Sequence, residues 1–149
     1  MGGRHASAAH SVRLTALALL AALAWLPAQA QTYDRVAVMR VLDGDTFEAR
    51  VEVWPDVLVA VSVRLAGVDA PELKGKCPGE RMTALRAYEM LDELLTHLPV
   101  TLAGVKHDKF AGRVDAVVTA GGVDVAQALI GVGLARKYEG GARQGWCGE

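Results

Sequence analysis

The sequence has little cysteine, no excess of positive charge and no long hydrophobic run. Its two cysteines, Cys77 and Cys147, belong to no CxxC pair, and no histidine lies at ligand spacing from them, so a zinc site is not predicted. Lysine and arginine number 16 against 17 acidic residues. This balance excludes a protein that holds nucleic acid by bulk electrostatics. A polyanionic substrate must be met by a few local arginines or through a metal ion.

The apolar run Leu14–Leu26 is shorter than the roughly 20 residues of a membrane-spanning helix. Arginines precede it, and Ala28-Gln29-Ala30 follows it as a signal-peptidase site. No cysteine lies near this site, which argues against a lipoprotein. We therefore expect residues 1–30 to be a cleaved secretory signal rather than a membrane anchor. The mature protein is then exported, to the periplasm or the medium, with no membrane attachment.

Residues 31–149 contain no repeat, linker or low-complexity segment, which predicts a single domain with a modest core. Because an even cysteine pair in an exported protein is typically bridged, a disulfide between Cys77 and Cys147 is predicted. We expect a monomer.

Valine-rich segments with alternating polar residues predict strands at 35–42, 46–53 and 58–65. The Asp43-Gly44 pair is a turn signal and makes the first two strands a hairpin. Along the third strand, the alternation directs Arg64 away from the row that faces the core. That row comprises Val59, Val61, Val63 and Leu65.

Apolar residues at three- and four-residue steps predict an amphipathic helix over Glu80 to His97. Its expected core face comprises Met82, Leu85, Tyr88, Leu91, Leu94, Leu95 and Leu98. Strands at 100–105 and 113–119 and a helix at 123–132 follow. The order β-β-β-α-β-β-α predicts a mainly β fold with helices (α+β), in which five strands form a small closed or nearly closed barrel.

Polar residues gather at three of the predicted strand ends. They are Asp43, Asp45 and Thr46 in "VLDGDTF", Arg64, Asp69 and Glu72 in "RLAGVDAPE", and Asp108, Lys109 and Arg113 in "DKFAGR". Singly, each group has a structural explanation, since Asp-Gly pairs commonly make turns and exposed arginines are commonly solvated. Together they contain the groups that phosphodiester hydrolysis requires.

That reaction needs an activated water, neutralised phosphoryl oxygens and a stabilised leaving group. Asp45 and Asp69 offer the hard carboxylate oxygens that calcium prefers. Arg64 and Arg113 each offer a planar fork of donors that suits phosphate oxygens. Glu72 remains as the group that could orient or deprotonate the water.

Five segments resemble, in order, the motifs of the staphylococcal nuclease (thermonuclease) family: "VLDGDTF", "VRLAGVDAPE", the amphipathic helix, "DKFAGRV" and "ALIGVGLAR". The resemblance covers about Val36 to Tyr138. It implies an OB-fold barrel with packed helices and calcium-dependent cleavage of DNA and RNA that leaves 3′-phosphate ends.

Carried over by motif, the resemblance makes Asp45 and Asp69 the calcium carboxylates and Ala70 a backbone-carbonyl ligand. It makes Arg64 and Arg113 the phosphate-binding pair. Glu72 becomes the proposed general base, while Asp43 and Thr46 support the site and Tyr138 lines the nucleotide pocket or packs beside it.

The chain differs from the family prototype in three ways. "DKFAGR" has one residue more than the prototype's "DKYGR", which leaves the placement of Arg113 open. The prototype's long basic third helix has no counterpart. The cysteine pair is also absent from the prototype, and a bridge could tie the tail to the loop after Glu72.

Two other interpretations of "VLDGDT" do not fit the sequence. A phosphotransferase Asp-x-Asp-x-Thr motif would place its threonine one position later, and an EF-hand loop would need glycine at its sixth position. The remaining alternative is a catalytically silent, nuclease-like OB-fold module that only binds nucleic acid or protein. Such modules typically lose some acids or arginines of the site, whereas Asp45, Arg64, Asp69, Glu72 and Arg113 are all present here.

Overall fold

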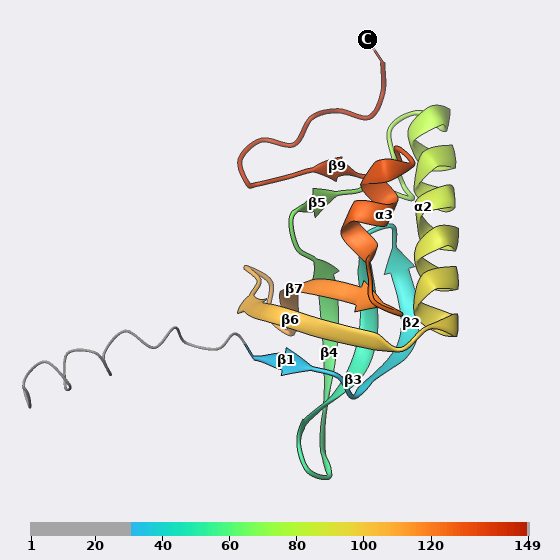
Figure 1. The fold of residues 1–149 in the computed structure, drawn as a ribbon. Coiled ribbons are helices and arrows are strands. Elements are labelled where there is room, and N and C mark those ends of the chain that lie inside the picture. The colour runs from blue at the N-terminus through green and yellow to red at the C-terminus, as the bar shows by residue number, and fades with distance from the viewer. Residues whose placement is uncertain (1–30, 149) are drawn as a thin grey trace, which may run out of the picture.

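The computed structural model describes residues 31–148, so the expected signal segment at residues 1–30 lies outside the described part. Two helices, α2 (Pro78–His97) and α3 (Val125–Gly131), accompany a strongly curved sheet (Figure 1). The strands are β1 (Thr32–Tyr33), β2 (Val36–Asp43), β3 (Thr46–Trp54), β4 (Val57–Leu65), β5 (Val68–Asp69), β6 (Val100–His107), β7 (Arg113–Ala120), β8 (Val123–Asp124) and β9 (Arg136–Lys137).

The main sheet has the strand order β1-β6-β7-β4-β3-β2, with β8 paired to β7. The pair β4 and β7 is parallel, and the other pairs in the sheet are antiparallel. The sheet curls until β2 contacts β6, although no hydrogen-bonded ladder joins them in the described part of the chain. The α+β class and the predicted order of five long strands and two helices are confirmed. The two-residue strands β1, β5, β8 and β9 add to that order.

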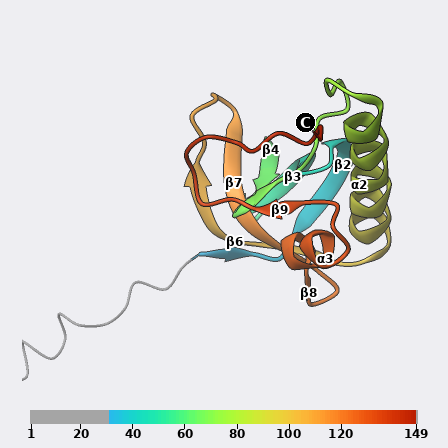
Figure 2. The same ribbon diagram turned by 90° about the horizontal axis from the view of Figure 1, so that it is seen from above.

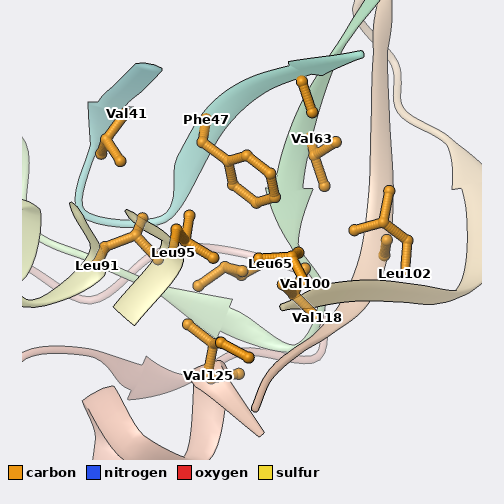
Figure 3. Close-up of a cluster of buried hydrophobic side chains, with 14 of the residues drawn as sticks. Val41, Phe47, Val63, Leu65, Leu91, Leu95, Val100, Leu102, Val118 and Val125 are labelled. Carbon is orange, nitrogen blue, oxygen red and sulfur yellow. The ribbon is translucent and has the colours of Figure 1, made fainter. Parts of the chain in front are cut away.

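The core lies inside this curve and under α2 (Figure 3). Phe47 and Leu65 point from β3 and β4 into the cluster that contains Leu91 and Leu95 of α2, and all four are buried. Val63 of β4, also buried, lies on the side of Leu102. Burying a side chain of this size contributes about 1.5–3 kcal/mol. These strands therefore have one strongly preferred register, in which their other face carries the polar residues.

The face of α2 that packs on the barrel differs from the expected one over its first turns. Met82 is 55% exposed and Leu85 is also exposed, whereas Ala84 and Ala87 are buried. The reason is the turn between β2 and β3, where a Cβ on Gly44 would lie 2.7 Å from the Cβ of Ala87. The helix approaches this turn so closely that only small residues fit between them. Leu91 and Leu95 are buried as expected.

The exposure of one strand residue and the length of the last helix also differ from expectation. The hairpin of β3 and β4 extends beyond the core (Figure 1), so Val59 is exposed although it shares the alternation of Val63 and Leu65. The last helix is shorter than predicted because β8 pairs with β7 first. The Asp124 side chain then caps α3 by accepting a 3.0 Å hydrogen bond from the backbone N–H of Gln127. No helix in residues 31–148 is both long and apolar enough to cross a membrane.

Candidate active site

Strand register brings the predicted polar residues together at one edge of the barrel. On β4, Arg64 pairs with Thr46 of β3 on one side and with Asp115 of β7 on the other. Ser62 of β4 pairs with Arg113, the first residue of β7. Paired residues on neighbouring strands point to the same face of a sheet, so Arg64, Arg113 and Asp115 share a polar face opposite the core.

The turn between β2 and β3 is organised by its own acids. Asp43 Oδ1 accepts a 3.0 Å hydrogen bond from the backbone N–H of Asp45, and the Thr46 hydroxyl donates to Asp45 Oδ1 at 2.7 Å. Asp45 and Thr46 are buried. Burial, reinforced by the negative charge of Asp45, raises the pKa of Asp43 to about 6. The turn therefore holds a buried carboxylate, Asp45, in one orientation.

Arg64 is a buried cation rather than a freely solvated one. Its Nη2 donates to Asp45 Oδ2 at 3.2 Å and to the backbone carbonyl of Val68 at 3.0 Å. Its Nη1 lies 4.0 Å from Asp115 Oδ1. The predicted direction away from the core row is found, but the side chain is buried there, in contact with Asp45, with the Val68 carbonyl of β5 and with Asp115 of β7. Arg64 is thus fixed by the turn between β2 and β3, by β5 and by β7 together.

Asp69 carries an oxygen that is free of aligned hydrogen bonds. It lies in β5, which pairs with β9, and its side chain is buried. Oδ2 accepts a 3.2 Å hydrogen bond from the indole N–H of Trp146. Oδ1 is buried without an aligned hydrogen bond, although Nε of Arg143 lies 3.0 Å away as a charge contact. The charge of this buried oxygen is thus compensated by the Arg143 guanidinium, and a metal ion is the other kind of cation that suits it.

The residues present fit a calcium ion. The backbone N–H of Ala70 lies 3.5 Å from Asp45 Oδ2, so the chain segment that carries Asp69 and Ala70 lies against Asp45. Asp45 in the turn between β2 and β3 and Asp69 in β5 are two buried carboxylates, and one oxygen of Asp69 accepts no aligned hydrogen bond. They form the loose set of hard oxygen donors that calcium tolerates better than magnesium. Backbone carbonyls of that segment, Ala70 included, could supply further ligands.

Arg113 lies in the same site despite the extra residue in "DKFAGR". Its Nε and Nη2 both lie 2.9 Å from Asp108 Oδ2, and its guanidinium lies 4.6 Å from the centre of the Phe110 ring. Gly112, immediately before Arg113, adopts a positive φ of 77°, which glycine tolerates. Burial acts to raise the pKa of Asp108, but hydrogen bonds from the Phe110 N–H and from Arg113 outweigh it and lower the pKa. Arg113 therefore faces a charged carboxylate at the rim of the site.

A cavity of about 590 Å³ lies in front of these residues. Arg64 and Arg113 line it from β4 and β7, Lys109 and Phe110 from the loop before β7, and Glu72 and Tyr138 from the segments after β5 and β9. Tyr138 donates its hydroxyl to the carbonyl of Gly141 at 2.7 Å, and its ring centre lies 6.0 Å from the Arg64 guanidinium. Tyr138 thus lines the cavity, which is consistent with the first of its two predicted roles, lining the nucleotide pocket.

Glu72 lies on the loop after β5, where its side chain is 59% exposed and lines the cavity. The loop is held by Glu80, a buried residue of α2 that sequence reasoning did not select. The Glu80 carboxylate accepts a hydrogen bond from the backbone N–H of Lys76 at 2.8 Å. Its other oxygen lies 3.5 Å from the backbone nitrogen of Glu72. An acid in the first turn of a helix is ordinarily explained by the helix dipole, so the sequence held no separate signal for this role.

The tail, residues 138–147, supplies two further residues that the sequence analysis did not select. The predicted disulfide between Cys77 and Cys147 is confirmed and ties the tail to the start of α2, where Figure 2 shows the two segments meeting. Arg143 and Trp146 of this tail contact Asp69, and Arg143 also contacts Glu72. The sequence "KYEGGARQGWC" has no motif that would have selected them, beyond the expectation that a bridge returns the tail to this loop.

A cavity of about 590 Å³ with convergent arginines, beside buried carboxylates on a curved seven-stranded sheet, suits a phosphate-containing polyanion. Residues 62–145 match the family model described as staphylococcal nuclease homologue, and the chain belongs to that family. It is similar to two "uncharacterized endonucleases", one from Escherichia coli O157:H7 and one from Escherichia coli, at 33% identity over 102 residues in each case. The matched region is 68% of this chain but only 60% of each of these curated relatives.

Proposed function

We propose that the protein is a calcium-dependent nuclease that hydrolyses phosphodiester bonds of DNA, RNA or both and leaves 3′-phosphate ends. Membership of the staphylococcal nuclease family and similarity to proteins named endonucleases support nuclease activity. The observation that carries the proposal is the convergence of Arg64, Arg113 and Glu72 on one cavity, beside the buried carboxylates Asp45 and Asp69.

Each residue has a role that its geometry permits. Arg64 and Arg113 approach the cavity from two adjacent strands, so two guanidinium forks can hold the oxygens of one phosphodiester and stabilise the charge that develops on them. Glu72 is exposed to the cavity, as a group that takes a proton from water must be. Asp45 and Asp69 would hold calcium, which supplies charge neutralisation next to the phosphate.

The acids beside the arginines shape how the site works. Asp108 and Asp45 each hold one arginine in place, which reduces the entropy lost when a phosphate is bound. The disulfide supports the further proposal that the protein acts outside the reducing cytosol, after export and cleavage of residues 1–30.

The test is cleavage of labelled single- and double-stranded DNA and RNA by the purified protein, with calcium, with magnesium or with chelator. We expect turnover in calcium, little in magnesium and none in chelator, because magnesium requires a stricter octahedron than this site offers. Product ends are checked by phosphatase treatment, which removes a 3′-phosphate and changes gel mobility.

Equal turnover in magnesium alone would contradict the calcium assignment. Products with 3′-hydroxyl ends would contradict the proposal that cleavage breaks the bond between phosphorus and the 5′ oxygen and leaves a 3′-phosphate. Binding of oligonucleotides without cleavage under any of these conditions would show the silent binding module instead. A Glu72→Gln variant serves as the matched control for contaminating nucleases, since it loses the proposed general base at an exposed position and should keep the fold.

A further inference from the structure

Arg143 of the tail lies between two acids of the site. Its Nε is 3.0 Å from Asp69 Oδ1 and its Nη1 is 2.9 Å from Glu72 Oε1. Burial acts to lower the pKa of Arg143, but the charges of Asp69, Glu72 and Asp45 outweigh this effect and raise it. The same guanidinium also lines the cavity that contains Arg64 and Arg113. A residue far along the chain thus contacts two acids of the candidate site.

The tail that carries Arg143 is fixed at several points. Arg136 Nη1 donates to the carbonyl of Gly145 at 2.8 Å, and its guanidinium lies 3.8 Å from the Trp146 ring centre. Trp146 in turn donates to Asp69, and Cys147 is bonded to Cys77. Arg136 precedes Arg143 in the sequence, and Gly145, Trp146 and Cys147 follow it closely, so the chain is held on both sides of Arg143. The position of its guanidinium is therefore set by the tail as a whole.

Glu72 needs such a partner. Its backbone is held through Glu80, but its side chain is exposed, and within residues 31–148 its carboxylate has one ion-pair partner, Arg143. A free glutamate side chain samples many rotamers, and fixing it has an entropic cost. A charge-assisted hydrogen bond at 2.9 Å selects one orientation in advance.

We propose that Arg143 is a positioning residue: it holds the Glu72 carboxylate towards the cavity, and the Cys77–Cys147 disulfide keeps it there. This inference rests on the proposed nuclease function and adds the tail, residues 138–147, to the active site. An exposed ion pair of this kind contributes little to stability. Its consequence lies in the orientation of Glu72, where a misplacement of about 1 Å can lower a rate by about a hundredfold.

The kinetic test is a double-mutant cycle of Arg143→Gln with Glu72→Gln. If Arg143 acts through Glu72, Arg143→Gln lowers kcat by about ten- to hundredfold and leaves KM within about threefold. In the Glu72→Gln background, it then has no further effect. Arg86→Gln, on the exposed face of α2, is the matched control and should leave the rate unchanged.

Two outcomes would overturn the proposal. An equal loss in both backgrounds would show that Arg143 acts independently of Glu72. A raised KM with unchanged kcat would show that it binds substrate directly. Because both outcomes require measurable cleavage by the wild-type protein, they are distinct from a failure of the nuclease proposal itself.

The disulfide is tested by the double variant Cys77→Ser with Cys147→Ser. We expect it to reproduce the kcat loss of Arg143→Gln, and the two changes together to be no worse than either alone. Full activity of the serine variant, with Arg143→Gln still damaging, would show that the remaining tail contacts suffice and would refute the role of the disulfide.

A measurement without substrate completes the test. The guanidinium N–H signals of Arg143 in ¹H–¹⁵N spectra should be resolved in the wild type and should broaden or shift in Glu72→Ala, because one of the two carboxylates that restrain the group is lost. Identical signals in the two proteins would exclude the contact whether or not the protein cleaves nucleic acid.

Discussion

The guanidinium of Arg64 lies 3.2 Å from the carboxylate of Asp45, and both side chains are about nine-tenths buried. A proposed phosphate-binding residue and a proposed calcium ligand are therefore one buried ion pair. Removal of one member of such a pair is costly, because the other charge stays buried without compensation. Stability and activity are coupled at this position.

For Arg64→Lys we expect the rate to fall by on the order of a hundredfold or more, because an ammonium cannot reproduce the planar fork. The structure adds a loss of stability. Lysine cannot keep both the Asp45 contact and the Val68 contact, so the free energy of unfolding should fall by roughly 1–3 kcal/mol. Kinetics and denaturant unfolding of one preparation check both effects. Wild-type stability would show that the pair is not formed in solution.

Glu72→Gln should lower the rate by about a hundred- to ten-thousandfold, since glutamine keeps the size of the side chain but cannot accept the proton. Because the side chain is 59% exposed, stability should change by about half a kcal/mol or less. Calcium affinity, measured by calorimetry, should change far less than the rate. Cleavage at the wild-type rate would remove Glu72 from the chemistry.

Arg113→Lys should lower the rate by about a hundredfold or more with little effect on folding, because the side chain lies at the rim of the site. Its pairing with Asp108 holds the fork in place, and a lysine would contact that carboxylate at one point only. Arg50→Lys, exposed on β3, is the matched control. A rate near the wild-type value would mean that Arg113 serves only to bind Asp108.

The raised pKa of Asp115 leads to a prediction about how folding stability depends on pH. Burial, with the charge of Asp108, raises its pKa above the ordinary 3.8, so the folded protein binds more protons than the unfolded one in the window just above that value. Stability from this group is therefore lost as the pH rises through its folded pKa. Asp115→Asn should be isostable with wild type near pH 3 and more stable at pH 7. The gain should be no more than about 1 kcal/mol, because the side chain is 35% exposed and solvent screens its charge. Thermal unfolding across this range checks the prediction, and a variant that is less stable at pH 7 contradicts it.

Reduction of the Cys77–Cys147 disulfide should lower the melting temperature. The bridge spans 70 residues, and closing such a loop stabilises the fold by at most about 4 kcal/mol in the chain-entropy model. Scanning calorimetry with and without reductant measures the shift. Two titratable thiols in the oxidised, denatured protein would contradict the bridge.

The local pattern of the sequence was sufficient for the elements and their order. Alternation of valine with polar residues defined β2, β3 and β4, because a half-buried strand must repeat every two residues. The same alternation placed Arg64 off the core row of β4. Chain order and motif spacing also brought Asp45, Asp69, Glu72 and Arg113 under consideration. The structure places Glu72 and Arg113 on one cavity, and Asp45 and Asp69 contact the cavity-lining residues Arg64 and Arg143.

What the sequence by itself determined is thus the fold class, the order of its strands and helices, and the residue types at the strand ends. The tertiary structure alone decided which face of α2 is buried, because the approach of Ala87 to Gly44 is a distance between elements and not a periodicity. It also decided that Arg64 is a buried partner of Asp45, and that Glu80, Arg143 and Trp146 contact residues of the candidate site or the loop that carries them. These residues come from a helix start and a tail, and contacts between segments so distant along the chain exist only after the sheet has curled and the disulfide has closed.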